Sequence, residues 1–521
     1  MSKRSANTPP DPQPRRRLML RVGAVWAGVS LAAVVWSLWG MTLDRSGGAE
    51  AAAHNARILW PYWIASASCW LGLTIVWIAL RRQVSHWPKQ GAWIVLGVAI
   101  LARLVVLVTH NPALSDDVYR YIFDGRNVAH GFNPYLTDPT DRRRALADGG
   151  GAENWAGERG LLPLLAYPEV TTPYLPFSQY VFAAMGVVCE AGGWTSPEAS
   201  ARVFRTGLVV IELLLMLLLL RVLRKREWSP WWLALYAWHP LAIDGFAASG
   251  HQDVIGIALM VAALAIGWAN AERGRGAWHS IMFAALSAGA VMVKPIAALA
   301  GLMAVRHMPL RAWIVSLIVG SIACIALALP LNWYPQQREF AAWKRTADWM
   351  AEKAAHFGGV YEPVLCVVRH QMSDGPDRQP GFNLEQEWLA RKICMWALAA
   401  TLLAIFILAR DAWRATAAAM LAVTLCSTTC HPWYLLWGLA LVPIGNRSWG
   451  LWVYGLTISF GYAVFFTGKG HALGVEWTVA PEALAIAYIP VAIGLCVDAC
   501  AMARRRRASP HVAELVTNET E

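Results

Sequence analysis

The apolar stretch "WIVLGVAILARLVVLVT" at Trp93–Thr109 is followed, after a short gap, by the charged stretch "SDDVYRYIFDGRNVAHGFNPY" at Ser115–Tyr135. The first stretch has the length and composition of a helix that crosses a membrane. The second carries three aspartates and two arginines in a chain that is otherwise poor in charge. We therefore expect a helix that crosses the bilayer and delivers a charged segment to its surface.

The composition is that of a membrane protein throughout. Hydrophobic residues make up 57% of the 521 positions and charged residues only 15%, which lies outside the usual range of soluble domains. Apolar windows long enough to cross the hydrocarbon recur along nearly the whole chain. The expected fold is an all-α polytopic membrane bundle of about 13–15 transmembrane helices.

The net charge is positive, with 45 Lys and Arg against 34 Asp and Glu, a formal +11. The basic residues gather in short clusters between the apolar windows: Arg15–Arg17, Arg81–Arg82, Arg221–Glu227 and Arg504–Arg507. Such clusters mark the cytoplasmic ends of membrane helices under the positive-inside rule. The membrane accounts for the charge, so we expect no nucleic-acid partner.

Following the windows from a cytoplasmic N-terminus assigns a side to every connecting segment. Residues 1–17 and 504–521 are expected to be cytoplasmic tails around a transmembrane domain at 18–503, with large outer loops at 111–172 and 332–387. The first window lacks a convincing cleavage site, so we interpret it as a retained span. The other polar motifs all fall on the outer side: Ile243–Asp253, Lys294-Pro295, Cys430–Trp437 and Thr467–Trp477.

One region leaves two topologies open. The windows Tyr174–Cys189 and Phe204–Leu220 cannot both be full crossings if the basic cluster Arg221–Glu227 is cytoplasmic. Either the first window is a partial or interfacial helix, or the loop before it contains another crossing.

The charged stretch itself predicts a helix with defined ends. Ser115 or Asp116 can cap its start, where acidic residues are favoured. Gly131, followed by Asn133-Pro134, can end it. The helix should therefore occupy most of the stretch.

One face of this helix predicts a site. Asp117, Arg120 or Tyr121, and Asp124 lie at spacings of three and four, so two carboxylates and a guanidinium can point into one cleft. The alternative is a solvated amphipathic helix with an intrahelical ion pair. The density of polar groups at the mouth of a membrane bundle favours the site.

A second polar group stands where an outer segment enters a span. Asp244, His251 and Asp253 all belong to the sequence "IDGFAASGHQD". A lone histidine near a membrane interface is usually a core or belt residue. A histidine with two aspartates, facing the same compartment as the charged stretch, is a candidate for the site.

Lys294 and His431 each stand alone in apolar sequence, in "AVMVKPIAAL" and "CHPWYLLW". An unpaired ammonium in such surroundings costs roughly 3 kcal/mol, so Lys294 needs an anionic partner. Either a protein carboxylate or a ligand phosphate would serve, and His431 poses the same choice. In the loop 332–387 most charge is that of a solvated loop, and only Tyr361-Glu362 is kept as a weak candidate.

These residue types suit the transfer of a sugar from a lipid-linked phosphate. The departing phosphate develops charge that Lys, Arg, His or a divalent ion can stabilise, and a carboxylate can take the proton of the attacking hydroxyl. A polyprenyl tail would lie along a lipid-facing groove, which is a reason to place the chemistry at the bilayer edge. No GxGxxG or GxxxxGK[ST] fingerprint is evident, consistent with a lipid donor instead of a nucleotide.

Four motifs spread over Ser115–Trp437 resemble those of the GT-C glycosyltransferases: "SDDVYRYIFDGRNVAHGFNPY", "SGHQDVIGIAL", "VMVKPIAAL" and "HPWYLLW". Within that superfamily the motifs resemble those of the bacterial polyprenyl-phosphate-mannose-dependent mannosyltransferases and their relatives. The resemblance implies an inverting enzyme of the bacterial inner membrane. It would move one sugar, mannose, from a polyprenyl-phosphate donor to an extracytoplasmic glycan, lipid or protein.

The resemblance also implies roles for the candidates. Asp116 or Asp117 is the catalytic base, and the sequence does not choose between them. Some GT-C enzymes need a divalent metal and others do not, so the use of a cofactor stays open. The candidate substrate-binding residues are Arg120, Tyr121, Asp124, Asp244, His251, Asp253, Lys294, Tyr361, Glu362 and His431.

Two other functions compete with this interpretation. A transporter or lipid flippase would pair the buried Lys and His with a moving anion, but it would need charges near the bilayer midplane, and no internal repeat is evident. An envelope polymerase or ligase that transfers whole oligosaccharides shares the donor chemistry. Only the acceptor and the length of the product would separate it from a transferase of single sugars.

Overall fold

The computed structural model describes residues 13–44, 49–81, 89–109, 112, 114–147, 152–273, 277–353, 357–372, 384–444, 447–466 and 481–508. Within these ranges the chain forms helices and no strand, as the composition predicted. The segment Thr467–Trp477 and most of both tails lie outside the described residues.

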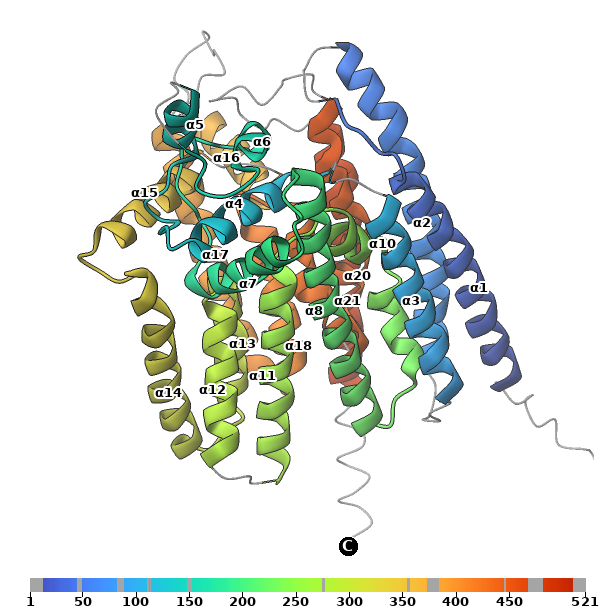
Figure 1. Cartoon of the computed structure of the whole chain (residues 1–521). Coiled ribbons are helices and arrows are strands. Elements are labelled where there is room, and N and C mark those ends of the chain that lie inside the picture. Colours follow the sequence, from blue (N-terminus) through green and yellow to red (C-terminus); the bar gives the residue numbers. More distant parts are fainter. Residues whose placement is uncertain are drawn as a thin grey trace, which may run out of the picture.

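Seven helices are long and apolar enough to cross a membrane by themselves, which confirms a polytopic membrane protein (Figure 1). Each coincides with an apolar window of the sequence. They are α1 (Gln13–Leu38), α2 (Ala49–Leu80), α3 (Lys89–Thr109), α8 (Pro197–Lys225), α14 (Leu310–Ala328), α17 (Leu384–Leu408) and α21 (Pro481–Ala508).

The other apolar windows form shorter or broken helices, so the larger number of crossings expected from the sequence stays a prediction. The predicted break at Lys294-Pro295 is confirmed, because one helix ends at Val291 and the next turn begins at Pro295. These elements are α11 (Asp253–Arg273), α12 (Ala277–Val291), η4 (Pro295–Ala297), α13 (Ala298–Val305), η5 (Leu329–Leu331), α18 (Ala412–Cys426), η6 (Pro432–Leu435), α19 (Leu436–Leu439), η7 (Val442–Ile444), α20 (Trp449–Thr457) and η8 (Ile458–Phe466).

The window Trp231–Ala248, which the sequence predicts as a single outward span, is divided into short pieces. Its four pieces are η2 (Pro230–Leu233), α9 (Ala234–Ala237), α10 (Pro240–Ala242) and the π-helical turn η3 (Ile243–Ala248). The chain then turns through 120° into α11. Gly250 lies at the turn with φ +72°, and a Cβ there would lie 2.7 Å from Cγ of Arg205, so only glycine fits. The bend brings Asp244, His251 and Asp253 together at one end of the bundle.

Helices outside the long spans cover that end, which is the upper end in Figure 1. Except for the helix at Pro176–Ala191, they come from the loops 111–172 and 332–387, which the sequence placed on the outer side. They are α4 (Asp117–Ala129), α5 (Pro139–Ala147), α6 (Glu158–Leu161), η1 (Leu162–Leu164), α7 (Pro176–Ala191), α15 (Arg338–Lys353) and α16 (Tyr361–Met372).

The helix predicted in the charged stretch is confirmed as α4. Asp116 occupies the N-cap position without a side-chain capping bond, and the Ser115 hydroxyl accepts a hydrogen bond from the Asp117 amide at 3.3 Å. Two residues past its last turn, Gly131 adopts φ +80°, a conformation that favours glycine. Both ends of the helix therefore follow from the sequence.

The helix α7 lies across the upper ends of its neighbours and does not run beside them (Figure 1). The amide of Phe177 donates to the carbonyl of Met292, just beyond α12, at 3.1 Å. The hydroxyl of Tyr180 donates to the carbonyl of Leu327, near the end of α14, at 2.7 Å. Of the two topologies left open, the structure supports the one in which the first window is a partial or interfacial helix, and α8 crosses alone.

The basic connecting segments meet at the opposite end of the bundle. A guanidinium nitrogen of Arg226 lies 3.9 Å from a carboxylate oxygen of Asp411, and Arg226 also donates to the carbonyl of Ile444. Arg81 donates to the carbonyl of Arg447 at 3.0 Å. Among the described residues, the basic connecting segments and the polar motifs that the sequence assigns to the outer side therefore lie at opposite ends of the bundle.

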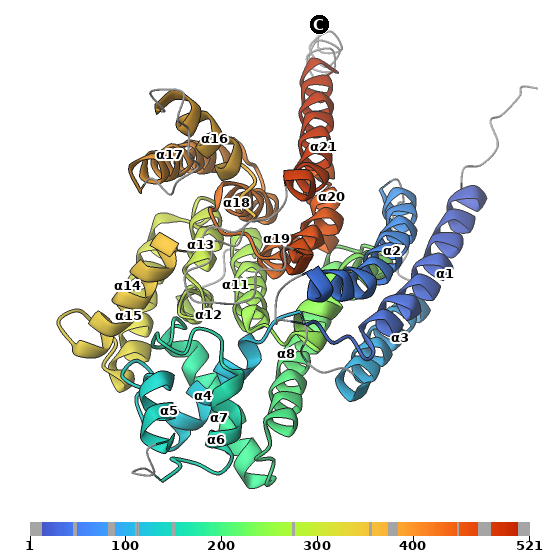
Figure 2. The same cartoon turned by 90° about the horizontal axis from the view of Figure 1, so that it is seen from above.

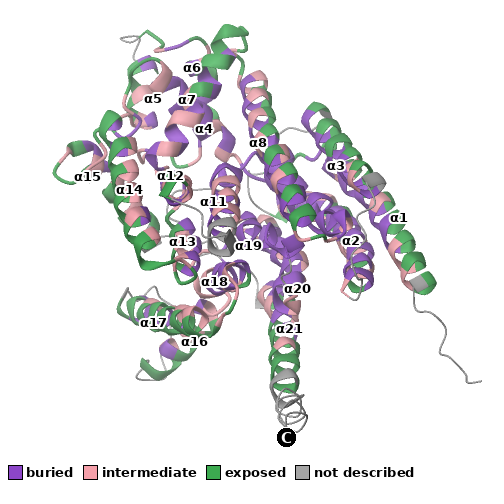
Figure 3. Ribbon diagram, turned by 90° about the horizontal axis from the view of Figure 1, so that it is seen from below, coloured by how far each residue is buried: buried purple, intermediate pink, exposed green. Residues whose placement is uncertain are grey.

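Seen along the bundle axis, α1–α3 form one flank and α12–α15 the other, with α8 and α11 between them (Figure 2). Buried residues concentrate on α11 and α19, whereas α14 and α17 show mostly exposed residues (Figure 3). Leu317 and Ile318 of α14 are 57% and 54% exposed. Apolar side chains on such outer faces are suited to contact with lipid.

Candidate active site

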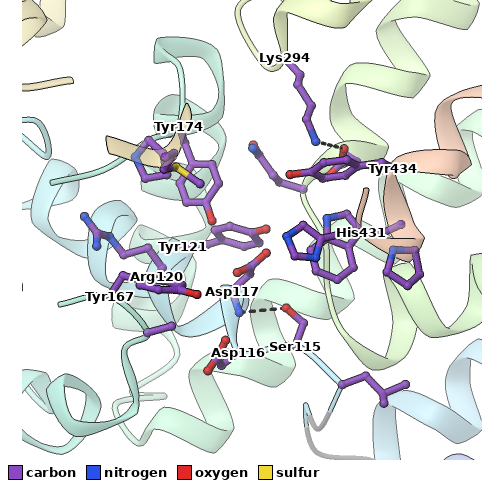
Figure 4. Close-up of a pocket in the computed structure, with 18 of the residues that line it drawn as sticks. Ser115, Asp116, Asp117, Arg120, Tyr121, Tyr167, Tyr174, Lys294, His431 and Tyr434 are labelled. Carbon is purple, nitrogen blue, oxygen red and sulfur yellow. Dashed lines mark hydrogen bonds and ion pairs between the residues drawn. The ribbon is translucent and has the colours of Figure 1, made fainter. Parts of the chain in front are cut away.

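Distant parts of the chain surround a cavity of about 340 Å³ at the upper end of the bundle (Figure 4). Its walls come from the start of α4, the segment between η1 and α7, the start of α11, the Lys294-Pro295 turn, α15, η6 and η8. This volume lies within the range of small-molecule sites. Each of the four sequence motifs contributes to it, through Asp116, Asp253, Lys294 and His431.

The start of α4 places two carboxylates and an arginine along the cavity. Asp116, Asp117, Arg120 and Tyr121 all line it, and Figure 4 shows Asp117 between Tyr121 and the histidine side of the cavity. Asp117 is the first residue of the helix, so its carboxylate lies at the positive end of the α4 dipole.

Asp124, the second carboxylate expected on this face, lies elsewhere. It is fully buried and accepts a hydrogen bond from Nε of Arg120 at 3.0 Å. Arg120 also donates to the carbonyl of Val170. Burial raises the pKa of the Asp124 carboxyl, with Arg120 opposing that rise. The intrahelical ion pair of the alternative interpretation is therefore present. The expectation that Asp124 faces the cavity was wrong, because α4 buries this residue against α7.

Lys294 has a protein carboxylate as its partner. Its ammonium lies 2.9 Å from Oδ1 of Asp253 and 3.6 Å from the ring centroid of Tyr434. Asp253 also accepts a hydrogen bond from the indole N–H of Trp437 at 2.7 Å. The Lys294 side chain is still 28% exposed, and it lines the cavity, so a cation anchored by a buried carboxylate faces the space where a ligand would bind.

Two histidines pack on one tryptophan. The ring of His251 stacks on Trp433 with centroids 3.7 Å apart, and that of His431 stacks on it at 4.5 Å. His431 lines the cavity, whereas His251 is fully buried behind it. Nδ1 of His251 lies 3.4 Å from Oδ2 of Asp117.

Asp244 supports the cavity wall from behind. It is fully buried and accepts hydrogen bonds from the hydroxyls of Tyr462 at 2.8 Å and Ser249 at 3.1 Å. Tyr462 lines the cavity. The segment Ile243–Asp253 therefore supplies three buried groups, each of which contacts a different cavity residue: Asp244 with Tyr462, His251 with Asp117, and Asp253 with Lys294.

A comparison with protein families identifies the family to which the chain belongs. Residues 18–309 match the model of the MptA_B family, described as "Alpha-(1->6)-mannopyranosyltransferase, N-terminal domain". The match covers more than half of the chain and includes α4, the bend and Lys294. The chain belongs to this family. A search of curated proteins found no match.

The protein is thus a glycosyltransferase of a mannosyltransferase family, in agreement with the GT-C resemblance of its motifs. The family match ends before η6, so it does not include His431 and Trp433. In the structure these two residues nevertheless complete the wall opposite α4.

The weak candidates Tyr361 and Glu362 are not brought to the mannosyltransferase cavity. Tyr361 is fully buried at the start of α16 and packs in a separate apolar cluster with Leu365 and Ala390. Neither residue is among those that line the cavity. Both residues lie in the loop 332–387, which folds α16 against α17.

Several cavity residues were not singled out from the sequence. Trp343 and Trp349 of α15 line the cavity, and Trp343 donates to the carbonyl of Pro173 at 3.2 Å. Their loop was interpreted as ordinary solvated sequence. Phe340, Trp343, Ala347 and Met350 recur at spacings of three and four among charged residues of α15, and this was the available signal for an amphipathic helix with a buried face.

Metal dependence, left open by the sequence, stays open. In the described part of the chain no group of three or more His, Cys, Asp or Glu side chains is arranged to hold a metal ion.

Proposed function

We propose that this protein transfers a single mannose from a polyprenyl-phosphate donor to an extracytoplasmic glycan, lipid or protein, with inversion at the anomeric carbon. The observation that carries the proposal is the cavity itself. It combines the carboxylates of Asp116 and Asp117 with the ammonium of Lys294 at the end of a membrane bundle, in a chain of a mannosyltransferase family.

The reaction needs a base and an anion-binding group on opposite sides of the sugar. An acceptor hydroxyl attacks the anomeric carbon, and an aspartate carboxylate takes its proton. The bond from that carbon to the phosphate oxygen breaks, and the phosphate leaves with the electron pair. The Lys294 ammonium and the His431 ring are suited to stabilise the charge that develops there.

The lining of the cavity supports a lipid donor. Beside the charged groups it includes the apolar side chains of Leu114, Val464 and Phe465. A phosphate bound near Lys294 would leave a prenyl chain free to extend along these side chains into the bilayer.

The separation of charged segments supports a cavity that faces away from the cytoplasm. Arg81 and Arg226 lie at the opposite end of the bundle, and the positive-inside rule assigns such residues to the cytoplasm. On this proposal residues 18–503 form the transmembrane domain, 1–17 and 504–521 are cytoplasmic tails, and the loops 111–172 and 332–387 are extracytoplasmic. The expected location is the bacterial inner membrane.

Substitution of the two carboxylates tests the proposed reaction. Asp116→Asn and Asp117→Asn are reconstituted in liposomes with polyprenyl-phosphate mannose and membrane acceptors, and transfer is followed by mass spectrometry. At least one variant should lose about 10²–10⁴-fold in rate, the usual contribution of a general base. Asp141→Asn is the matched control, because Asp141 is a 74% exposed carboxylate of α5 outside the cavity. Full activity in both cavity variants would refute the proposed base.

Labelling of cysteines tests the side. A membrane-impermeant maleimide should react in intact cells with Asp141→Cys at the cavity end and not with Arg224→Cys at the end of α8, after subtraction of the parent signal. The reverse pattern would place the cavity in the cytoplasm.

A further inference from the structure

His251 lies directly behind the carboxylate pair and takes no part in the reaction described so far. Its side chain is fully buried, and neither ring nitrogen makes a hydrogen bond of regular geometry within the described protein. An imidazole buried in this way has one N–H donor and one acceptor to satisfy. Leaving them unpaired is costly in a low-dielectric interior.

The carboxylate nearest to the His251 ring indicates the role of that ring. Nδ1 of His251 lies 3.4 Å from Oδ2 of Asp117, just beyond hydrogen-bond distance. Catalytic hydrogen bonds are often long without substrate and shorten when the substrate is bound. Asp117 is 32% exposed, so its carboxylate faces the cavity and is also approached by a buried ring.

The position of the ring is fixed by independent contacts. The backbone amide of His251 donates to the carbonyl of Gly245 at 2.8 Å, and Gly250 before it holds the left-handed turn. The ring lies nearly parallel to Trp433, at an angle of 16°. A ring fixed through its backbone and through one face in this way can orient a neighbour instead of adapting to it.

We propose that His251 is a positioning residue that donates a hydrogen bond from Nδ1 to Oδ2 of Asp117, and that Asp117, not Asp116, is therefore the catalytic base. The inference rests on the proposed function. The bond holds one carboxylate oxygen and leaves Oδ1 directed toward the acceptor hydroxyl. The proton of that hydroxyl passes to Asp117, while His251 keeps its own proton.

Three substitutions separate this role from simple packing. His251→Phe keeps a ring on Trp433 but has no nitrogen. His251→Asn places an amide N–H near the position of Nδ1, and His251→Gln places one near Nε2. We expect His251→Phe to lower kcat about 10- to 100-fold, as misplacement of a catalytic group does, with the KM for polyprenyl-phosphate mannose changed less than about threefold. His251→Asn should recover at least about tenfold of that loss, and His251→Gln should not.

A double variant tests the route through Asp117. If His251 acts only on that carboxylate, His251→Phe should cause no further loss in the Asp117→Asn background. Multiplied losses in the double variant, or full kcat in His251→Phe, would overturn the inference. Equal activity of the Asn and Gln variants would also overturn it, and that comparison holds even if His251→Phe fails to fold. Failure of the native protein to transfer mannose from this donor would instead refute the proposed function.

Discussion

One ion pair of this mannosyltransferase connects α3 with α8 and another connects the Lys294-Pro295 turn with α11, and the two differ in what surrounds them. Arg103 of α3 and Glu212 of α8 form a bidentate pair with N···O distances of 2.7 and 2.6 Å, and both side chains are completely buried. Lys294 and Asp253 are joined by one contact of 2.9 Å, and the lysine is 28% exposed to the cavity. We call the first, which is completely buried, the closed pair, and the second, which faces the cavity, the open pair.

The comparison shows which of the two isolated cations has a structural role. Arg103 also donates to the carbonyls of Ala99 and Ala237, so its guanidinium is used entirely within the protein. Lys294 has an ammonium that can accept a further anion. In the sequence both are single cations in apolar windows, and only the structure distinguishes them.

The largest expected effect is on stability, from breaking the closed pair. Arg103→Met leaves Glu212 buried without a counter-charge, which should lower the free energy of unfolding by about 3–5 kcal/mol. Denaturation in detergent micelles measures the loss. The double variant Arg103→Met with Glu212→Met should return close to the native stability, and its specific activity should be unchanged. A double variant that is stable but inactive would show that the closed pair also serves the site.

The open pair should show the opposite balance of effects. Lys294→Met leaves Asp253 with the Trp437 N–H and with access to the cavity, so the loss of stability should be smaller than for Arg103→Met. The KM for the polyprenyl-phosphate donor should rise about tenfold or more, equivalent to about 1.4 kcal/mol or more of donor binding. Adding Asp253→Asn should restore stability but not the KM. An unchanged KM in Lys294→Met would remove Lys294 from the donor site.

A smaller effect is expected from the indole that supports the open pair. Trp437→Phe deletes the hydrogen bond to Asp253, which should cost about 1–3 kcal/mol of stability and raise the donor KM a few-fold. Trp413→Phe is the matched control, since the buried Trp413 N–H has no hydrogen-bond partner among the residues that the structure describes. Equal losses in the two variants would show that the hydrogen bond to Asp253 has no special weight.

The smallest effect concerns the pair Arg120 and Asp124 and depends on pH. Because burial raises the pKa of Asp124, the folded state holds its proton more tightly than the unfolded chain. Its contribution to stability should be greatest below the unfolded pKa and fall as the pH rises through the raised value. The difference in Tm between the native protein and Asp124→Asn should therefore decrease with rising pH. An increase with pH would show that Arg120 outweighs the desolvation.

Much of the fold could be predicted because it depends on local patterns. The apolar windows predicted the positions of the long helices. Pro295 predicted the break after α12, because a proline has no backbone N–H to donate. The capping residues around α4 gave its ends to within a residue or two. The reversal of the chain between the windows Trp231–Ala248 and Val254–Ala269 was expected. The division of the first window into four short pieces was not predicted, because most of these breaks are set by tertiary packing.

The candidate site was predictable in kind more than in arrangement. The motifs identified which residues carry charge near the outer end, but not which of them face the cavity. Asp117 and Asp124 lie two helical turns apart on the same face of α4. Only the packing of α7 decides that Asp124 is buried while Asp117 is partly exposed to the cavity. Tyr361-Glu362 had the right residue types, and the contact of α16 with α17 removed them from the cavity.

The most direct test of this account is a cryo-EM structure of the protein with a non-hydrolysable polyprenyl-phosphonate mannose. The account predicts a phosphonate within hydrogen-bond distance of the Lys294 ammonium, a mannose in the cavity beside Asp117, and a prenyl chain that leaves toward the bilayer. A head group bound at the opposite end of the bundle, among Arg81 and Arg226, would contradict it.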